Sequence, residues 1–165
     1  MGIEGIGARV LRKEDKRFIT GKGRYTDDMS VPGMKHAHFV RSPHAHAEIK
    51  KIDTKKALAM PGVIAVLTGN ELKADGIGNI ICGWMIHSKD GSPMKMGAWS
   101  PLATDTVRYV GDAIVIVVAD TKSQARDAAE AVEITYKVKK AVVSAVDALK
   151  AGAPQIHPEA AGNLI

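Results

Sequence analysis

The sequence is poor in cysteine, and this scarcity excludes several kinds of site. Cys82 is the only cysteine among the 165 residues. A disulfide needs two thiols, and a thiolate zinc cage or an iron–sulfur cluster needs several, so this chain alone holds none of them. Such a composition is typical of the reducing cytosol, and we expect a cytoplasmic protein in which Cys82 is a buried, inert thiol.

Long apolar runs are missing as well. No stretch approaches the ~18 consecutive apolar residues of a membrane-spanning helix, and the opening residues lack the apolar core of a signal peptide. Gly2 follows Met1, but Ile6 stands where a myristoylation signal has Ser or Thr. We therefore predict a soluble protein with no membrane span.

Aromatic residues are few: two Phe, three Tyr and two Trp. The 165 residues suffice for one domain with a real core, which must be built mainly from Val, Ile, Leu and Ala. The net charge is +5, from 23 basic and 18 acidic residues, but the basic residues are scattered in small groups such as Lys50–Lys51. Scattered lysines are typical of solvated faces, so a nucleic-acid partner is not favoured.

Apolar periodicity predicts an α+β fold, with a mixed β-sheet and a few packed helices. Strands are expected over 35–41, 45–52, 63–67, 113–119 and 133–138. Helices are expected over 55–60 after a cap at Asp53 or Thr54, over 68–72, from Thr121 to about Val132, and over 144–150. The strand–helix–strand order between 113 and 138 predicts a right-handed crossover.

The last two strands and the helix between them carry the clearest patterns. Residues 113–119 are apolar throughout, as in a strand that is covered on both faces. The alternation in 133–138 predicts that Ile134, Tyr136 and Val138 point inward. The helix has a stripe of small residues, which lets its backbone lie close to a sheet; they are Ala125, Ala128, Ala129 and Val132.

Glycine, proline and charge divide the chain into three parts. Residues 1–34 are rich in glycine and charge and predict an extended, non-helical arm that lies against something else. Residues 35–152 form the main domain, and 153–165 form a loop-like tail. Inside the main domain, the glycine- and proline-rich stretch 73–105 predicts a long loop without regular structure.

This long loop is the candidate interaction surface. A structureless stretch of such length within a domain is usually functional or disordered. Both tryptophans, Trp84 and Trp99, lie in it together with Met85 and Met94. Disordered linkers are poor in these residue types and interfaces are rich in them, so we expect an ordered excursion that packs on a partner.

Pairs of histidines are the first candidates for chemistry. His36 and His38, and likewise His44 and His46, lie two residues apart, so each pair shares one face of a strand and could chelate a metal. No nearby cysteine completes a tetrahedral set, and exposed strand-face histidines are the commoner outcome. We therefore assign no metal ligand.

The other catalytic patterns are weak. His87, Ser88 and Asp90 are close in the sequence, but adjacency is a poor guide to triad geometry and there is no nucleophile elbow. The glycine pairs at 5 and 7 and at 76 and 78 do not form a dinucleotide-binding fingerprint. We assign no catalytic and no cofactor-binding residue in this chain.

Five segments together resemble one protein family. They are 17–28 (RFITGKGRYTDD), 39–47 (FVRSPHAHA), 61–69 (PGVIAVLTG), 90–95 (DGSPMK) and 108–112 (RYVGD). In this order they are similar to the amino-terminal α/β hammerhead domain of the large subunit of aerobic carbon monoxide dehydrogenases. Related molybdenum hydroxylases, the xanthine dehydrogenases and aldehyde oxidases, belong to the same family. Two departures from its pattern are Ala113, where proline is common, and the residues after Tyr136.

The resemblance implies an α/β hammerhead fold and a structural or assembly role within an oxidoreductase. In this family a molybdenum–pterin cofactor and a catalytic glutamate lie in later domains of a longer large subunit. Electrons leave through an iron–sulfur subunit and an FAD-containing flavin subunit. The tail 153–165 would lead toward the molybdenum-binding region, and that region and the two subunits are the expected partners. Carbon monoxide, aldehydes, purines and other heterocycles are all substrates of relatives.

Residues from two segments are expected to form the interface with these partners. They are Arg41, Ser42, Pro43, His44, His46, Trp84, Met85, His87, Met94 and Trp99. The alternative is a stand-alone protein-binding module of the same fold with no enzymatic role. A third possibility is a small independent enzyme that uses His44, His46 or His87.

Overall fold

The computed structural model describes residues 5–8 and 10–165. The chain divides into two compact units, Met1–Met34 and Lys35–Ile165. In the first, α1 (Asp15–Ile19) precedes a turn of 3-10 helix, η1 (Thr26–Asp28), and the rings of Phe18 and Tyr25 stack with centroids 5.4 Å apart. None of the described residues of this unit is buried. The expectation of a non-helical arm is wrong for α1.

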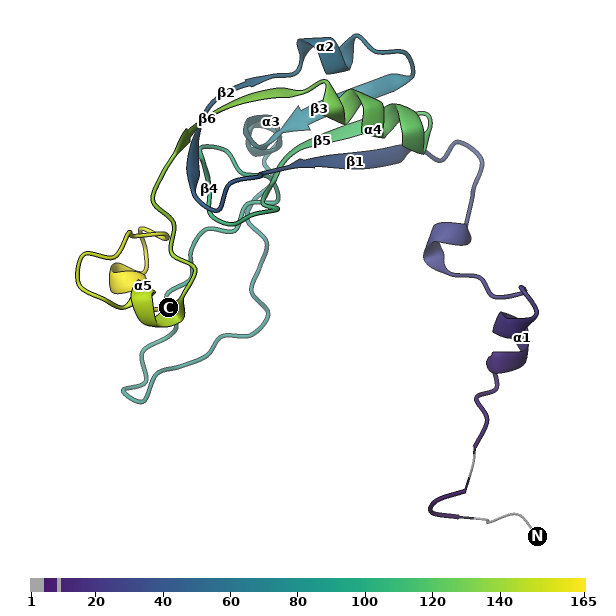
Figure 1. Cartoon of the computed structure of the whole chain (residues 1–165), viewed down its shortest axis with the longest axis horizontal. Coiled ribbons are helices and arrows are strands. Elements are labelled where there is room, and N and C mark those ends of the chain that lie inside the picture. The colour runs from purple at the N-terminus through teal and green to yellow at the C-terminus, as the bar shows by residue number, and fades with distance from the viewer. Residues whose placement is uncertain (1–4, 9) are drawn as a thin grey trace. The chain divides into compact units, whose positions relative to one another are not determined.

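The second unit holds two three-stranded antiparallel sheets (Figure 1). One has the strand order β1-β5-β3 and the other β4-β2-β6. The strands are β1 (His36–Arg41), β2 (Ala47–Asp53), β3 (Val63–Thr68), β4 (Thr106–Val107), β5 (Ala113–Ala119) and β6 (Glu133–Val138). Every strand that the periodicity predicted is present, and the α+β class is confirmed.

The pairing of the strands corrects two expectations. Every pair is antiparallel, and β5 and β6 lie in different sheets, so the right-handed crossover and the single mixed sheet are wrong. The reason is that β1 and β3 already occupy both edges of β5. β6 finds no free edge beside β5, and it pairs instead with β2 in the second sheet.

The core is aliphatic, as the scarcity of aromatic residues predicted. Ile114, Val115 and Val117 of β5 are fully buried, together with Val107 of β4 and Ala47 of β2. Residues from both sheets and from the helix after β5 therefore belong to one hydrophobic cluster. Burial of these side chains from water is the main term that holds the two sheets together.

The helix after β5, α4 (Lys122–Glu130), lies over the β1-β5-β3 sheet (Figure 1). It begins where the sequence predicted, because Thr121 Oγ1 accepts a hydrogen bond from the backbone N–H of Gln124 at 3.2 Å. Ala125, Ala128 and Ala129 are buried against the sheet. The predicted stripe of small residues is thus the face that allows close packing.

The other helices are short: α2 (Lys55–Leu58), α3 (Gly69–Ala74), α5 (Ala145–Ala148) and the 3-10 turn η2 (Ala161–Asn163). At the start of α3, the backbone N–H of Thr68 donates to Glu71 Oε2 at 2.6 Å. Ser144 Oγ accepts from the N–H of Asp147 at the start of α5. Of the helices within the described residues, none has the length and apolar content needed to cross a membrane.

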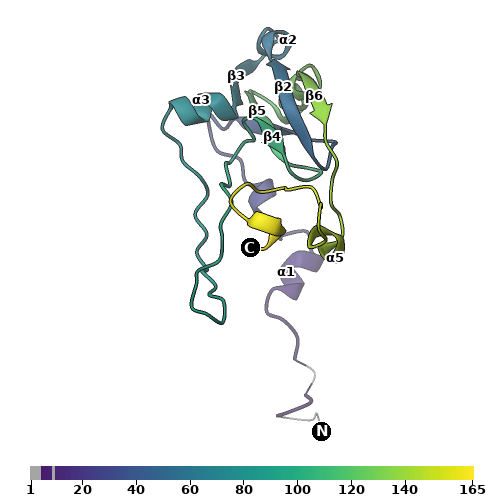
Figure 2. The ribbon, with the colours of Figure 1, turned by 90° about the vertical axis from the view of Figure 1, so that its left-hand side faces the viewer.

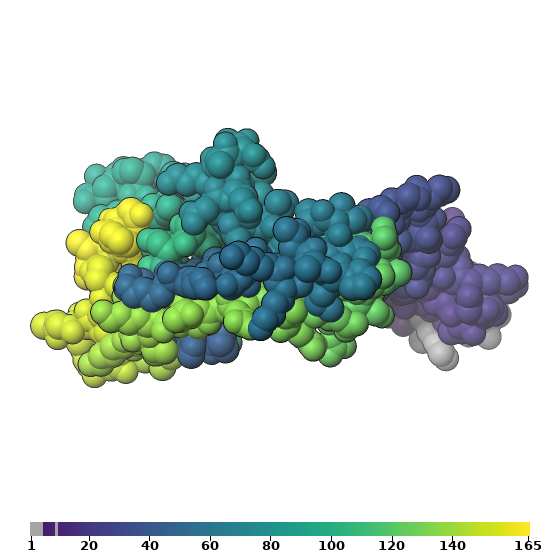
Figure 3. All heavy atoms as spheres, turned by 90° about the horizontal axis from the view of Figure 1, so that it is seen from above, coloured from purple at the N-terminus to yellow at the C-terminus, as the bar shows by residue number. Residues whose placement is uncertain are grey.

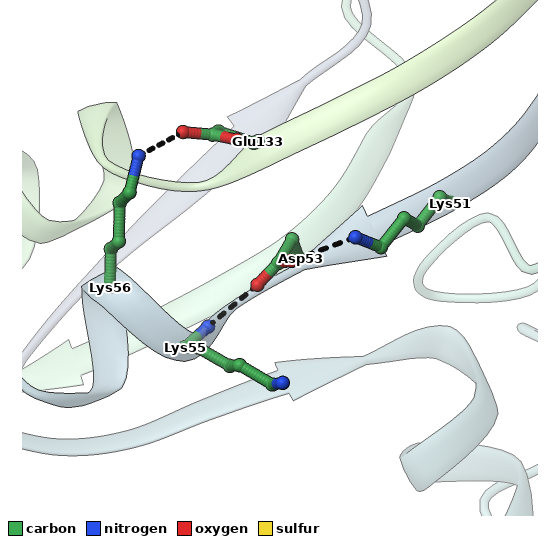
Figure 4. A network of polar contacts seen from close by, with 5 residues as sticks. All are labelled: Lys51, Asp53, Lys55, Lys56 and Glu133. Atoms are coloured by element: carbon green, nitrogen blue, oxygen red, sulfur yellow. Dashed lines mark hydrogen bonds and ion pairs between the residues drawn. The ribbon is translucent and has the colours of Figure 1, made fainter.

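A network of charged side chains fixes the end of β2 (Figure 4). Asp53 accepts a hydrogen bond from Lys51 Nζ at 2.9 Å and one from the backbone N–H of Lys55 at 3.2 Å. These two donors lower the pKa of the Asp53 carboxyl. Glu133, the register partner of Asp53 on β6, pairs with Lys56. Asp53, one of the two predicted caps, thus supplies the side-chain oxygen at the start of α2.

Two predictions of burial are wrong. Val138, expected to point inward from β6, is 63% exposed because the strand ends there at the edge of its sheet. Cys82 is exposed in the long loop, where its thiol donates to the carbonyl of Trp84 at 3.1 Å. Its surroundings are therefore not those of an inert core cysteine.

The close approach of α4 to the sheet predicts a cost for added volume. Ala128→Leu should lower the free energy of unfolding by about 1–3 kcal/mol, because Ala128 is fully buried and leaves no room for a larger side chain. Urea denaturation followed by circular dichroism measures this. Ser123→Leu, at an exposed position of the same helix, is the control and should change it by less than about 0.5 kcal/mol. Equal effects of the two substitutions would contradict this packing.

Candidate interface

The end of β1 and the turn before β5 are hydrogen-bonded to each other, which brings two of the quoted motifs together. The backbone N–H of Ser42 donates to the carbonyl of Asp112 at 2.8 Å, and that of Gly111 donates to the carbonyl of Ser42 at 2.8 Å. Arg41 Nη1 donates to the carbonyl of Gly111 at 2.9 Å. We call Arg41, Ser42, Gly111 and Asp112 the motif joint. Ser42 is buried, so water competes little for its two backbone hydrogen bonds.

The histidines that follow the motif joint pack inside the domain. Ser42 Oγ accepts the backbone N–H of His44 at 3.0 Å, and the His44 ring meets Tyr136 edge-on with centroids 4.9 Å apart. His46 is only 7% exposed, and its Nδ1 donates to the carbonyl of Lys140 at 2.9 Å. The expectation of exposed strand-face histidines is therefore wrong for His46. The His44 ring therefore joins the residues before β2 to β6, and the His46 ring joins them to Lys140, which follows β6.

Arg108 ties the turn before β5 to the C-terminal segment, residues 141–165. Its backbone N–H donates to Asp112 Oδ2 at 3.0 Å, and its Nε donates to the carbonyl of Ile156 at 3.2 Å. Within the segment, the Asn163 side chain accepts the N–H of Ile156 at 2.9 Å and donates to the carbonyl of Pro154 at 2.9 Å. The motif joint thus holds both the turn and, through Arg108, the C-terminal segment.

The tip of this turn presents an apolar surface. Tyr109 and Val110 are 44% and 65% exposed, and the ring of Trp99 lies beside Tyr109 with centroids 6.1 Å apart. Partial burial, with a smaller contribution from the Asp112 carboxylate, raises the pKa of the Tyr109 hydroxyl. Tyr109 is therefore neutral at physiological pH, and the tip exposes aromatic and aliphatic surface to solvent.

The sequence predicted a long loop over 73–105; its first two residues belong to α3, and residues 80–99 form an irregular hairpin, which we call the long hairpin (Figure 2). Near its base the backbone N–H of Ile80 donates to the carbonyl of Trp99 at 2.8 Å. Near its tip the N–H of Met94 donates to the carbonyl of Ile86 at 2.8 Å. These bonds join its two limbs, but the hairpin forms no ladder of regular strands.

Large apolar side chains of the long hairpin are exposed to solvent. They are Ile80, Ile81, Trp84, Met85, Ile86, Met96 and Trp99. Trp84 and Ile81 are the most exposed, at 79% and 89%. Single exposed apolar residues are normal, but a large exposed apolar patch is a feature that interaction sites commonly have, which makes this hairpin the candidate interface.

A cleft of about 600 Å³ lies at the base of the long hairpin. Trp99, Tyr109 and Arg108 line it together with His157 of the C-terminal segment. Gly97 allows this approach, because a Cβ there would lie 2.4 Å from His157 Nδ1. Figure 3 accordingly shows the C-terminal segment (yellow) beside the limbs of the hairpin (teal).

The candidate groups for chemistry do not assemble into a reactive site. Asp90 accepts hydrogen bonds from the backbone N–H and the hydroxyl of Ser92, at 2.9 and 2.6 Å, and so shapes the tip of the hairpin. In the part of the chain that the structure describes, no three His, Cys, Asp or Glu side chains gather closely enough to hold a metal ion.

Comparison with known proteins identifies the family of this chain. Residues 20–140 match the family described as "Aldehyde oxidase and xanthine dehydrogenase, a/b hammerhead domain". The chain belongs to this family. Over 163 residues it is 41% identical to the carbon monoxide dehydrogenase large chain of Hydrogenophaga pseudoflava, a match that covers 98% of this chain and 19% of the relative.

Solved structures show the same likeness. A Cu,Mo-containing carbon monoxide dehydrogenase superposes with a TM-score of 0.73 at 38% identity, over 92% of this chain and 18% of that one. Quinoline 2-oxidoreductase from Pseudomonas putida 86 gives a TM-score of 0.78 at 35% identity, over 89% and 18% of the two chains. The resemblance and the hammerhead fold predicted from the sequence are confirmed. The chain spans about a fifth of the length of these relatives.

The hammerhead domain places the predicted interface residues in three different settings. Exposed to solvent are Arg41, Pro43, Trp84, Met85, His87 and Trp99; His44 and Met94 are half-buried, and Ser42 and His46 are buried. Ser42 and His46 therefore support the surface from within. Sequence reasoning missed the neighbouring Ile80, Ile81, Ile86, Tyr109 and Val110, although isoleucines in a glycine-rich loop are a usable signal.

The motif joint predicts a specific sensitivity at Gly111. Its φ of +92° lies in the region that side chains avoid, so Gly111→Ala should lower the free energy of unfolding by about 1–2 kcal/mol. Chemical denaturation measures the change. Gly78→Ala is the matched control, because Gly78 has no positive φ and open space around it. A neutral Gly111→Ala would mean that the turn does not need this backbone conformation.

Burial raises the pKa of the Tyr136 hydroxyl, and this predicts a loss of stability in alkali. The folded state holds the phenol neutral, so its contribution is complete below the unfolded pKa of about 10 and is lost as pH rises through the folded pKa. Tyr136→Phe should flatten the fall in unfolding free energy between about pH 9 and pH 11. Denaturation curves at several pH values test this, and an unchanged slope would contradict the burial of the hydroxyl.

Proposed function

We propose that this chain is a structural and assembly domain of a molybdenum hydroxylase large subunit, and that it carries no catalytic centre of its own. The observation that carries the proposal is the long hairpin, a hydrogen-bonded element whose large apolar side chains are exposed to solvent. Exposure of large apolar side chains to water costs free energy. A partner that covers them removes this cost. The motif joint and the aliphatic core would hold this surface in place.

The C-terminal segment offers further apolar surface. Val143, Val146 and Leu149 are 94%, 72% and 61% exposed, although α5 and the Asn163 hydrogen bonds fix the backbone around them. The matched relatives are about five times longer than this chain, so most of each relative lies outside the matched part. These exposed groups support a role in which the domain packs on further protein.

The partners that we propose are those that the family resemblance implies. The molybdenum-binding part of the large subunit would hold the molybdenum–pterin cofactor, and an iron–sulfur subunit and an FAD-containing flavin subunit would complete a cytoplasmic assembly. Carbon monoxide dehydrogenase-like chemistry would then belong to the assembly rather than to this chain. Residues of the described domain contribute packing and positioning to it.

Purification from the native cell tests the proposal. The chain, tagged and isolated gently, should bring with it a molybdenum-binding polypeptide, iron and a flavoprotein; metal analysis and mass spectrometry measure these. A tagged protein of similar charge is the control for adventitious binding to a basic chain. A metal-free preparation without such polypeptides would contradict the proposal and favour the stand-alone binding module.

A further inference from the structure

The outer side of β6 is a free edge of the second sheet, which we call the β6 edge. In the order β4-β2-β6, β6 pairs with β2 on one side and with no described strand on the other (Figure 2). Among the described residues, no backbone group outside β2 forms a hydrogen bond with the backbone of Glu133–Val138. Alternate residues of an edge strand direct unpaired N–H and C=O groups outward, so this edge can accept a further strand.

The other sheet edges are shorter or lie closer to helices. The outer strand β4 has only two residues, whereas β6 has six, a usual length for a strand that pairs. In the first sheet, α2 and α3 pack against β3, and α4 lies over β1. The β6 edge is therefore the long edge without a neighbouring helix among the described elements.

Lysines gather at one end of the β6 edge, where Lys137, Lys139 and Lys140 are all exposed. The register places Lys137 opposite Glu48 of β2. A hydrogen bond from Lys50 lowers the pKa of the Glu48 carboxyl, and the charges of Lys139 and Lys137 lower it further. A single carboxylate thus lies among several ammonium groups, so this end of the edge carries excess positive charge.

We propose that the β6 edge binds an extended acidic segment of another protein, which pairs with it as an added strand of the second sheet. Backbone hydrogen bonds hold the segment, and its Asp or Glu side chains meet Lys137, Lys139 and Lys140. A side chain of the added strand covers Val138, which is 63% exposed. No three successive residues of this chain are acidic, so we assign the segment to a different protein.

This site is separate from the long hairpin and does not depend on the proposed function. Its rival is a purely protective role, because lysines at a sheet edge also keep the edges of neighbouring molecules apart. The two roles differ in what the edge admits. A protected edge excludes every added strand, whereas the proposed site admits an acidic strand and excludes a neutral one.

Fluorescence anisotropy with defined peptides tests the site on the full chain. The probe is a labelled peptide in which Glu alternates with Thr, and it should bind. The same peptide with N-methylated backbone amides keeps its charge but cannot donate to the edge, so it should bind at least about tenfold more weakly. A peptide with Gln in place of Glu should also bind at least about tenfold more weakly.

Substitution of the lysines locates the site. The triple variant Lys137→Gln, Lys139→Gln and Lys140→Gln should weaken binding of the Glu peptide by at least about tenfold. Its thermal unfolding midpoint should stay unchanged, because the three side chains are exposed.

A matched control removes the same charge elsewhere in the chain. The triple variant Lys73→Gln, Lys89→Gln and Lys95→Gln, also at exposed positions, should weaken binding by less than about threefold. Equal effects of the two triple variants would mean that the net charge of the chain binds the peptide, and the proposal would be overturned.

The remaining outcomes are equally decisive. Equal binding of the methylated and unmethylated peptides would show that the backbone of the edge takes no part. Failure of the Glu peptide to bind would leave the lysines as protection of the edge. Tighter binding of a DNA duplex or of phosphatidylserine vesicles at the same salt concentration would assign the surface to another class of partner.

Discussion

The arrangement of the domain depends on the pairing of β5 along both of its edges. With β1 on one side and β3 on the other, β5 becomes the buried centre of one sheet and leaves no edge for the strand that follows it. The chain then passes through α4, whose alanines allow close packing, and forms a second sheet around β2. One aliphatic core joins the two sheets and α4. This core fixes the position of the loops that leave the sheets.

The motif joint connects this frame to the surface that we propose as the interface. Ser42 and Gly111 bond the ends of two strands of one sheet, and Arg108 extends the connection to the C-terminal segment. The long hairpin, whose base lies against His157 of that segment, projects apolar side chains that the domain itself does not cover. The described residues therefore hold and present a surface, and they assemble no metal-binding cluster.

The sequence allowed the strands, α4 and the family to be predicted, because each rests on local pattern or on motif order. The continuous apolar run of β5 and the Thr121 cap are signals of this kind. Sheet membership was out of reach, since a strand–helix–strand pattern does not show which edges are already occupied. The burial of His46 and the exposure of Cys82 depend on contacts with Lys140 and on the path of the hairpin, which periodicity does not encode.

Hydrogen–deuterium exchange tests the central claim, that this domain is a rigid frame with a docking hairpin, most directly. The chain alone and the chain in its native assembly would be compared peptide by peptide. The account predicts that amides of β5 are protected in both states, and that amides of 80–99 exchange more slowly in the assembly than in the chain alone. Equal exchange of 80–99 in the two states, with β5 protected in both, would contradict it.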